Sequence, residues 1–547
     1  MKRFHLYRVR FWGAYRPETV AALGALGVLF TILAATLVLL HGHFSYAFDD
    51  PYIGLALAEN IARFGHYGVN LVEYSSPSSS ILYPFLLVPF FWIGIPTAGP
   101  LILAFFFTAA TAALCAWYFS KRLRFSDPLA AGLALGLAAA AGAFGVAFSG
   151  LEHSLHILAT VLLAFALIEF VRAQWSDGAV SSRWLWVLVG AAILNPLIRF
   201  EGLALSACVM VILVCARRVG AAALALAGIA GCLGIYMLAM QHLGLPLLPS
   251  SVLTKESSAA LIVGAPHGFL GGVLGTIIRQ LFANLRGMSP QLAAALIGPF
   301  LLLAGYVAFA DRGCRAEKVL SWGALGVLAL YFCFGNVLSL RYDCFLIAFA
   351  LALIAYVYRE TIQNIARLDF GRIAALAVLA ALVFAIQIKA AAFIPLAADN
   401  IYLQQYQMHR LAVLLDMPVA VNDLGWVSYE NDQYVLDLFG LASEPARQAR
   451  AAHDLSYAER LAREYNVHFA MVYPELLGEY LPGNWVRIGT LQFSVRKVNA
   501  ANSSVSLYAF DLTPEACRAL ANRIAAFGSS LPSGASLTTD PAACAAL

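Results

Sequence analysis

Charged residues are scarce in this sequence, and their scarcity excludes most classes of protein. Asp, Glu, Lys and Arg make up 12% of the 547 residues, whereas 61% of the residues are hydrophobic. Soluble domains usually carry roughly 25% charged residues. The mean hydropathy is +0.76. This composition excludes a soluble globular or a disordered protein and predicts many membrane-spanning helices.

A large excess of positive charge is also missing. The formal net charge is +4 over the whole chain, and basic residues that bind nucleic acid form much denser patches. We therefore expect no nucleic acid partner.

Cysteine spacings typical of a metal site are absent as well. Seven of the nine cysteines lie in or beside apolar segments and are interpreted as small buried hydrophobic residues. Cys517 and Cys544 stand apart in the polar C-terminal part. If that part lies outside the cytoplasm, we expect them to form a disulfide.

Long apolar runs, by contrast, recur along most of the chain. A helix rises 1.5 Å per residue, so about 20 apolar residues cross roughly 30 Å of hydrocarbon. About eleven spans are predicted: 19–40, 99–119, 128–148, 155–171, 184–198, 203–216, 220–241, 292–310, 319–338, 344–358 and 373–394. The first run is longer than the roughly 7–15 apolar residues of a signal peptide. We interpret it as an uncleaved anchor.

A shorter apolar run, residues 81–92, contains two prolines and is expected to lie at the membrane interface. Lys and Arg concentrate in cytoplasmic loops. When 81–92 is left out of the span count, the basic loops after residues 119, 216, 310 and 358 all fall on the side of the basic N-terminus. That side is then cytoplasmic, and the loop 41–97 lies outside.

The chain becomes polar after residue 397, and residues 398–547 are expected to form a small extracytoplasmic α/β domain. Apolar runs at 419–421, 434–438 and 469–473 indicate strands, and the amphipathic stretch 457–465 indicates a helix. Residues after about 527 are rich in Ala, Ser, Gly and Pro. We expect them to form a loosely held tail.

The main candidate for chemistry is the acidic pair Asp49-Asp50 at the start of the outer loop. Pro51 and Tyr52 follow, and apolar residues at helical spacing indicate that a helix begins there. In a structural interpretation, the acids cap the first helical turn. In a catalytic interpretation, one carboxylate in a partly apolar cavity takes a proton from an acceptor hydroxyl as a general base. Local sequence does not separate the two.

Other polar groups fall on the same predicted face. Glu73 belongs either to a Ser-rich turn or to a site that binds a metal or a sugar hydroxyl. Glu152 and His153 lie between two spans and are expected to face a cavity, because a charge that faces lipid is costly. Arg199 and Glu201 flank a hairpin, either as an ion pair or as ligands. The sequence requires no metal and leaves a divalent cation open.

Three cations fall on the outer face, although Lys and Arg usually concentrate on the cytoplasmic side. They are Lys255, Arg279 and Arg341. A bound phosphate would explain them, because Arg and Lys stabilise the charge that develops on a phosphate leaving group. Their alternative role is to reach lipid headgroups. We expect these residues to bind the phosphate of a donor.

Several motifs resemble the GT-C superfamily of membrane glycosyltransferases, in particular the actinobacterial arabinofuranosyltransferases and their proteobacterial relatives. The likeness spans most of the membrane part. The matching motifs are Phe48-Asp49-Asp50-Pro51-Tyr52, Ala58-Glu59-Asn60, Gly65-His66, Glu73, Ser149-Gly150-Leu151-Glu152, Arg199-Phe200-Glu201-Gly202, Leu248-Pro249 with Lys255, and Arg341-Tyr342. Two features depart from the family: Phe200 replaces a proline, and Asn422-Asp423-Leu424-Gly425 is similar only to uncharacterised relatives.

The resemblance implies a GT-C-like catalytic domain over residues 1–397, with juxtamembrane helices in the loop 41–97. It implies an inverting transfer of a sugar, with arabinofuranose as a candidate, from a polyprenyl-phosphate donor to a glycan, lipid or protein of the cell envelope. Asp49 is then the expected base with Asp50 beside it, and Tyr52 and Tyr342 belong to the site. The reaction would occur at the periplasmic face of a bacterial inner membrane.

A polytopic transporter or lipid flippase with a glycan-binding outer domain is the alternative. Transporters place ionisable groups near the bilayer midplane and often contain internal repeats. Here the charges gather at one face, and no later segment repeats the first 120 residues. The sequence therefore favours an enzyme.

Overall fold

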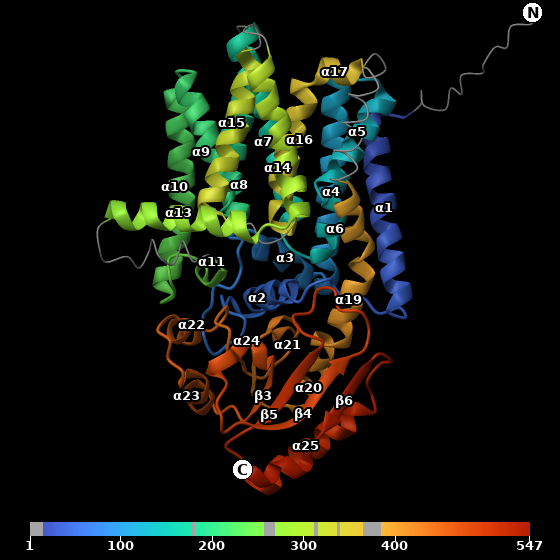
Figure 1. Cartoon of the computed structure of the whole chain (residues 1–547), viewed down its shortest axis with the longest axis vertical. Helices are drawn as coiled ribbons and strands as arrows, with labels where there is room; N and C mark the ends of the chain where they lie inside the picture. The colour runs from blue at the N-terminus through green and yellow to red at the C-terminus, as the bar shows by residue number, and fades with distance from the viewer. Residues whose placement is uncertain (1–14, 178–180, 256–268, 311–314, 336–339, 365–383) are drawn as a thin grey trace, which may run out of the picture.

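The computed structural model describes residues 15–177, 181–255, 269–310, 315–335, 340–364 and 384–547. The chain forms a bundle of helices with a sheet-containing C-terminal part at one end of the bundle (Figure 1). Seven described helices are long and apolar enough to cross a membrane, or eight if one bent pair counts as a single span. The prediction of a polytopic helical membrane protein is confirmed.

The seven candidate spans come from both halves of the membrane part. They are α1 (Pro17–Leu39), α4 (Gly99–Lys121), α7 (His153–Arg172), α10 (Val219–His242), α14 (Pro290–Phe309), α15 (Arg315–Phe334) and a helix over Phe384–Leu415. The bent pair is α5 (Asp127–Ala140) with α6 (Ala143–Val146) and η3 (Ala147–Ser149).

Three of the roughly eleven predicted spans correspond to helices that are not among these candidate spans. α8 (Ser182–Ile198) and α9 (Gly202–Cys215) have only 17 and 14 residues, so neither has the length of a full span. α16 (Leu340–Val357) begins where the described residues resume and packs against α7. The first half of the predicted span 373–394, residues 373–383, lies outside the described residues, and its second half belongs to the helix over Phe384–Leu415.

Other helices lie at the end of the bundle that faces the C-terminal part. α2 (Asp50–Phe64) and α13 (Phe269–Gly287) run across the bundle rather than along it (Figure 1). α3 (Tyr83–Trp92) packs on α2 and has ten residues, about half the length that a span requires. This agrees with the expectation that residues 81–92 do not cross as a helix. The search for long apolar runs had not predicted α13.

The C-terminal part contains a six-stranded sheet with the order β2-β1-β3-β5-β4-β6. β2, β1 and β3 are parallel, and the other neighbours pair antiparallel. The strands are β1 (Val419–Val421), β2 (Val435–Asp437), β3 (Phe469–Val472), β4 (Val486–Phe493), β5 (Ser504–Ala509) and β6 (Ala535–Thr539). Every residue of β1, β2 and β3 is buried, as in parallel strands covered on both faces. The predicted α/β character is confirmed.

Helices connect these strands and link the sheet to the bundle. They are α19 (Ile394–Leu403), α20 (Gln405–Leu415), α21 (Gly425–Ser428), α22 (Glu444–Ala451), α23 (Tyr457–Glu464), α24 (Pro474–Leu477) and α25 (Pro514–Gly528). The boundary expected between residues 397 and 398 falls within α19, which therefore belongs to both parts.

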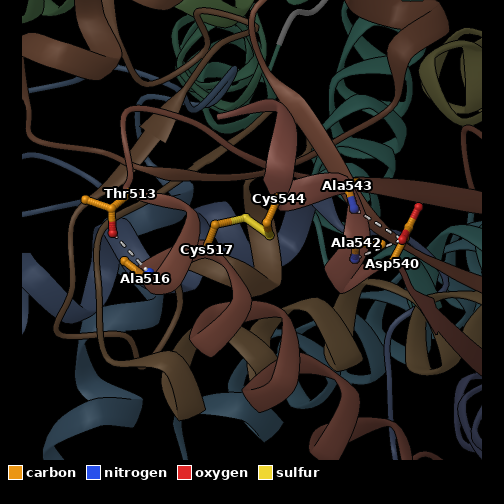
Figure 2. Close-up of a disulfide and its surroundings, with 7 residues drawn as sticks. All are labelled: Thr513, Ala516, Cys517, Asp540, Ala542, Ala543 and Cys544. Atoms are coloured by element: carbon orange, nitrogen blue, oxygen red, sulfur yellow. Dashed lines mark hydrogen bonds between the residues drawn. A yellow bond between two sulfur atoms is a disulfide. The ribbon is translucent and has the colours of Figure 1, made fainter.

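The end of the chain is an ordered edge of the sheet, unlike the loosely held tail that composition suggested. β6 pairs antiparallel with β4. Cys517 of α25 forms a disulfide with Cys544, with their Cα atoms 5.7 Å apart (Figure 2). Main-chain hydrogen bonds and a covalent bond thus hold a segment whose side chains alone gave no sign of packing.

Candidate active site

Asp49 lies between the bundle and the C-terminal part, immediately before α2. Its Oδ2 accepts a hydrogen bond from the main-chain N–H of Gly425 at 2.6 Å, and its Oδ1 accepts one from Trp426 at 2.9 Å. Asp49 is only 6% exposed. A Cβ on Gly425 would overlap the Asp49 carboxylate, so a glycine is required there. Both carboxylate oxygens of Asp49 therefore accept hydrogen bonds from the C-terminal part.

A second carboxyl group, that of Asp423, lies beside Asp49. Asp423 follows β1 at the carboxyl ends of the parallel strands, where open α/β sheets commonly bind ligands. Its Oδ2 accepts a hydrogen bond from Gln405 Nε2 at 2.8 Å. Burial, followed by the charge of Asp423, raises the pKa of Asp49 well above its usual value, and burial raises the pKa of Asp423. We expect the two groups to share one proton.

This shared proton predicts that the protein loses stability as the pH rises. The two pKa values are raised on folding, so the folded state binds protons more tightly than the unfolded state does. The contribution of this one shared proton to stability is fully present below about pH 4, the pKa in the unfolded chain, and is lost at about 1.4 kcal/mol per pH unit as the pH rises toward the raised pKa. Thermal unfolding measured between pH 4 and 9 should show this slope. An Asp423→Asn variant should show a shallower slope, and an unchanged slope would contradict the shared proton.

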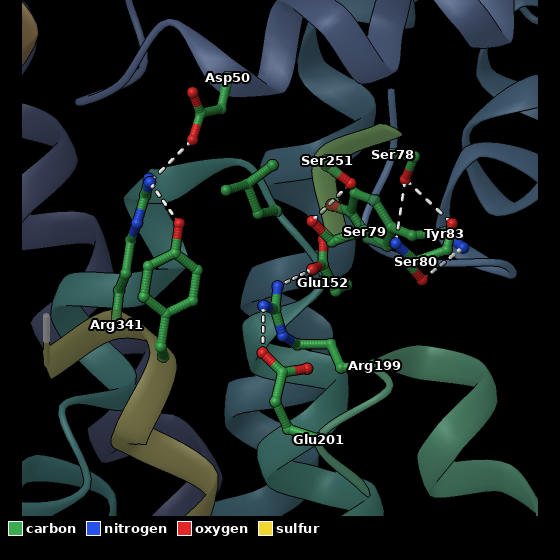
Figure 3. Close-up of polar contacts among 12 residues, drawn as sticks. Asp50, Ser78, Ser79, Ser80, Tyr83, Glu152, Arg199, Glu201, Ser251 and Arg341 are labelled. Atoms are coloured by element: carbon green, nitrogen blue, oxygen red, sulfur yellow. Dashed lines mark hydrogen bonds and ion pairs between the residues drawn. The ribbon is translucent and has the colours of Figure 1, made fainter. Parts of the chain in front are cut away.

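Asp50, the first residue of α2, faces the bundle instead (Figure 3). Its Oδ2 forms an ion pair with Arg341 Nη2 at 2.8 Å. The same nitrogen donates a hydrogen bond to the Tyr342 hydroxyl at 2.9 Å. The rings of Phe48 and Tyr342 lie 4.4 and 4.9 Å from the Arg341 Cζ. Two aromatic rings therefore fix the guanidinium in place, and Asp50 is its partner.

Arg341 also lines a cavity of about 260 Å³, formed by helices of the bundle together with Val498 and Asn499 of the C-terminal part. Most of the other lining residues are apolar, among them Phe48, Phe393 and Ile394. Within the described part of the chain, Arg341 Nη1 and the lining Gln387 Nε2 are buried and have no hydrogen-bond partner. Two unsatisfied donors in an apolar cavity fit a ligand that has an anionic head and an apolar body.

Asp50 lines a second cavity of about 50 Å³, on the other side of the ion pair. Its lining, which we call the Asp50 cavity, is mixed: the polar side chains of Ser79, Glu152, Arg199 and Tyr342 lie among apolar residues such as Ile53 and Leu151. The Asp50–Arg341 ion pair therefore links the apolar cavity to a second cavity that contains several charged and polar groups.

Arg199 forms a buried network with two carboxylates beside this second cavity (Figure 3). It pairs with Glu152, and with Glu201 at 2.7 Å. The ring of Tyr342 lies 5.1 Å from the Arg199 Cζ, so Tyr342 contacts both cations. His153 is also buried, with its ring 5.9 Å from that of Tyr342. The structure thus brings together part of the polar groups that the loop charges assigned to the outer face, namely Asp50, Glu152, His153, Arg199, Glu201 and Arg341.

Other predicted site residues lie outside this arrangement. Glu73 accepts a hydrogen bond from the Tyr434 hydroxyl at 3.0 Å, and burial raises its pKa to about 6. Tyr52 is fully buried and stacks on Trp426 at 3.8 Å. Arg279 is exposed on α13. Lys255 ends α11 (Ser250–Lys255), and its side chain lies outside the description.

A metal site has no support among the residues that the structure describes. No three His, Cys, Asp or Glu side chains there are arranged to hold a metal ion.

Most of the residues that sequence reasoning missed come from the C-terminal part, and one, Gln387, comes from the bundle. Asp423, Gly425 and Trp426 all contact the start of α2. Their signal was present as the Asn422-Asp423-Leu424-Gly425 motif after a predicted strand, but nothing in the sequence linked it to Asp49. Gln387 gave no signal, because a single amide in an apolar run has no local pattern.

Comparisons with known proteins find a match to a family model and similarity to solved structures. Residues 399–508 match a family described as "Domain of unknown function (DUF8728)". No curated protein matches the chain. The chain is similar to the crystal structure of ArnT from Cupriavidus metallidurans bound to undecaprenyl phosphate, with 12% identity, a TM-score of 0.49 and coverage of 88% of this chain and 97% of that one. The apo state of ArnT gives 12% identity, a TM-score of 0.48 and coverage of 89% and 98%.

Proposed function

We propose that this protein is a membrane glycosyltransferase that moves a sugar from a polyprenyl-phosphate donor to a hydroxyl of a cell-envelope glycan, lipid or protein. The observation that carries the proposal is the position of Arg341. Its Nη1 is an unsatisfied donor in the apolar cavity, and its Nη2 binds Asp50, which lines the Asp50 cavity. One guanidinium therefore reaches both a site for a lipid phosphate and a site for an acid–base reaction.

The apolar cavity supplies the donor site in this proposal. The donor phosphate would accept hydrogen bonds from Arg341 Nη1 and Gln387 Nε2, and its prenyl chain would lie along Phe393 and Ile394 toward the lipid. Charge-assisted hydrogen bonds from arginine to phosphate are among the stronger ones in proteins. Lys255 and Arg279 stay candidates for additional phosphate contacts.

The Asp50 cavity supplies the acceptor site in this proposal, with Asp50 as the base. Asp50 takes the proton of an acceptor hydroxyl, and the hydroxyl oxygen forms a bond to the anomeric carbon. The bond from that carbon to the phosphate oxygen breaks, and polyprenyl phosphate leaves with the electron pair, which Arg341 stabilises. A single displacement inverts the anomeric configuration. Arabinofuranose is the first sugar to test, and the only reason is that the sequence motifs resemble those of arabinofuranosyltransferases.

We place this site at the periplasmic face of a bacterial inner membrane, with the N-terminus in the cytoplasm. Lys121 and Arg172 end α4 and α7 at the far end of the bundle from the C-terminal part, and Arg359 begins α17 (Arg359–Gln363) at that end too (Figure 1). Basic residues mark the cytoplasmic side of a membrane protein. The sheet and the acidic pair would then lie outside.

Binding of a short-chain prenyl phosphate to the purified protein tests this assignment without requiring the sugar. We expect Arg341→Gln to weaken binding roughly 10–100-fold, because a charged hydrogen bond to the phosphate is lost. We expect Asp50→Asn to tighten binding about 2–5-fold, because the carboxylate no longer competes for the guanidinium. Isothermal titration calorimetry in detergent gives both affinities.

Arg63→Gln is the matched control, since it removes an arginine from the Glu59 ion pair on α2, away from both cavities. Its affinity should equal that of the wild type. Equal affinity of Arg341→Gln and wild type would contradict the donor site. Counterflow of a solute without release of prenyl phosphate from any donor would instead support a transporter.

A further inference from the structure

The β1–α21 loop, by which we mean residues 422–424 together with the first two residues of α21, meets the acidic pair from the side of the sheet. We propose that this loop is a positioning element of the active site, which fixes Asp49 and thereby sets the direction of Asp50 toward Arg341. The inference rests on the proposed function and assigns a role to the segment that matches a domain of unknown function.

The first argument is the order of residues at the start of α2. Asp49 immediately precedes the helix, and Asp50 is its first residue. Two main-chain N–H groups hold the Asp49 carboxylate at 2.6 and 2.9 Å. Aromatic rings hold Arg341, the partner of Asp50. With the cation fixed, the Asp50–Arg341 geometry depends on how the chain is held at Asp49.

The second argument is that the sheet itself holds the loop. Asn422 Oδ1 accepts a hydrogen bond from the main-chain N–H of Tyr473, which follows β3, at 3.0 Å. Gln405 of α20 donates to Asp423 at 2.8 Å. Neighbouring parallel strands and a packed helix therefore fix the residues that bind Asp49.

The third argument is that further contacts extend this support along α2. Trp426 stacks on Tyr52 at 3.8 Å, just after the acidic pair. The N–H of Glu430 donates to Glu59 Oε2 at 3.3 Å, nearer the end of α2. Just before the acidic pair, Asn499 Nδ2 donates to the Ala47 carbonyl at 2.8 Å. Contacts on both sides of Asp50 restrain its backbone.

A Gly425→Ala variant tests the proposal, because the added Cβ would meet the Asp49 carboxylate. We expect kcat to fall at least tenfold while the KM for the donor changes less than twofold. Prenyl phosphate should bind at least as tightly as to the wild type, since Asp50 no longer competes fully for Arg341. Gly483→Ala is the matched control: Gly483 is exposed in the same part of the chain, and a Cβ there meets nothing within 4 Å.

Hydrogen exchange supplies a readout that does not depend on turnover. Amides of residues 45–57 should exchange faster in Gly425→Ala than in the wild type and in Gly483→Ala. Unchanged exchange, or a wild-type kcat, would overturn the positioning role. If the wild type binds no prenyl phosphate while the exchange still responds, the proposed function fails and the positioning contact stands.

Substitutions of Trp426 separate positioning from general stability. Trp426→Phe keeps a ring against Tyr52 and should retain kcat within about threefold of the wild type, whereas Trp426→Leu should lower kcat in the same way as Gly425→Ala. A parallel loss of kcat and donor binding in Trp426→Leu and Gly425→Ala would indicate partial unfolding and would overturn the proposal.

Discussion

Replacing Asp50 by asparagine is expected to lower turnover by about 10²–10⁴-fold, the usual contribution of a general base. The asparagine side chain would keep the size of the original and its place beside Arg341, but it could not take a proton from the acceptor hydroxyl. Donor binding should persist, so the loss should appear in kcat. Release of prenyl phosphate from a polyprenyl-phosphate sugar, measured at saturating donor, provides the test.

Asp49→Asn is the contrasting variant, because sequence resemblance assigned the base to Asp49. An asparagine there can still accept a hydrogen bond from Gly425 or Trp426 through its single oxygen, and it can donate to Asp423. We therefore expect a loss of about tenfold or less, that is, about one hydrogen bond. A larger loss in Asp49→Asn than in Asp50→Asn would return the base to Asp49.

Replacing Arg199 by methionine is expected to destabilise the protein by about 3–5 kcal/mol, the usual cost of breaking a buried ion-pair network. Arg199 is 5% exposed and pairs with Glu152 and Glu201. Methionine fills a similar volume but leaves two buried carboxylates without a cation. Equilibrium unfolding in mixed micelles measures the change in the free energy of unfolding.

Arg63→Met provides the comparison for an exposed ion pair. The Arg63 side chain is 57% exposed and pairs with Glu59 at 2.9 Å on α2. Pairs of this kind usually contribute less than about 1 kcal/mol. Similar destabilisation by the two substitutions would show that the Arg199 network is no more important for stability than an ordinary surface pair.

The membrane part could be predicted well because its signals are local. Apolar length placed the long helices of the bundle, although it also counted the shorter α8 and α9 as spans. The charges of the loops assigned Glu152, Arg199 and Arg341 to one end of the bundle, where the structure brings them together. The prediction failed at α13, because a helix that lies across the bundle needs no long apolar run. It also failed at β6, where main-chain pairing orders a segment of small residues.

The acidic pair is a feature whose roles could not be predicted from the local sequence. The local sequence did not decide whether Asp49 and Asp50 cap a helix or take part in catalysis. The resemblance to the GT-C superfamily then favoured Asp49 as the base. In the structure, Asp49 makes no side-chain cap hydrogen bond within α2 and instead binds the start of α21, 376 positions later in the sequence. No pattern around residue 49 carries information about that partner. The division of roles between the two acids therefore required the tertiary structure.

The separation between Asp49 and Gly425 also matters during biosynthesis. Asp49 enters the membrane with the first span, but Gly425 is synthesised 376 residues later, roughly 20–75 s at a bacterial ribosome. Until the sheet has folded against the bundle, the Asp49 carboxylate has none of its final hydrogen bonds. An unfinished or truncated chain would carry Arg341 and most of the apolar cavity, without its Val498 and Asn499 wall, and would lack the support for Asp50. Donor lipid could therefore begin to bind before transfer became competent.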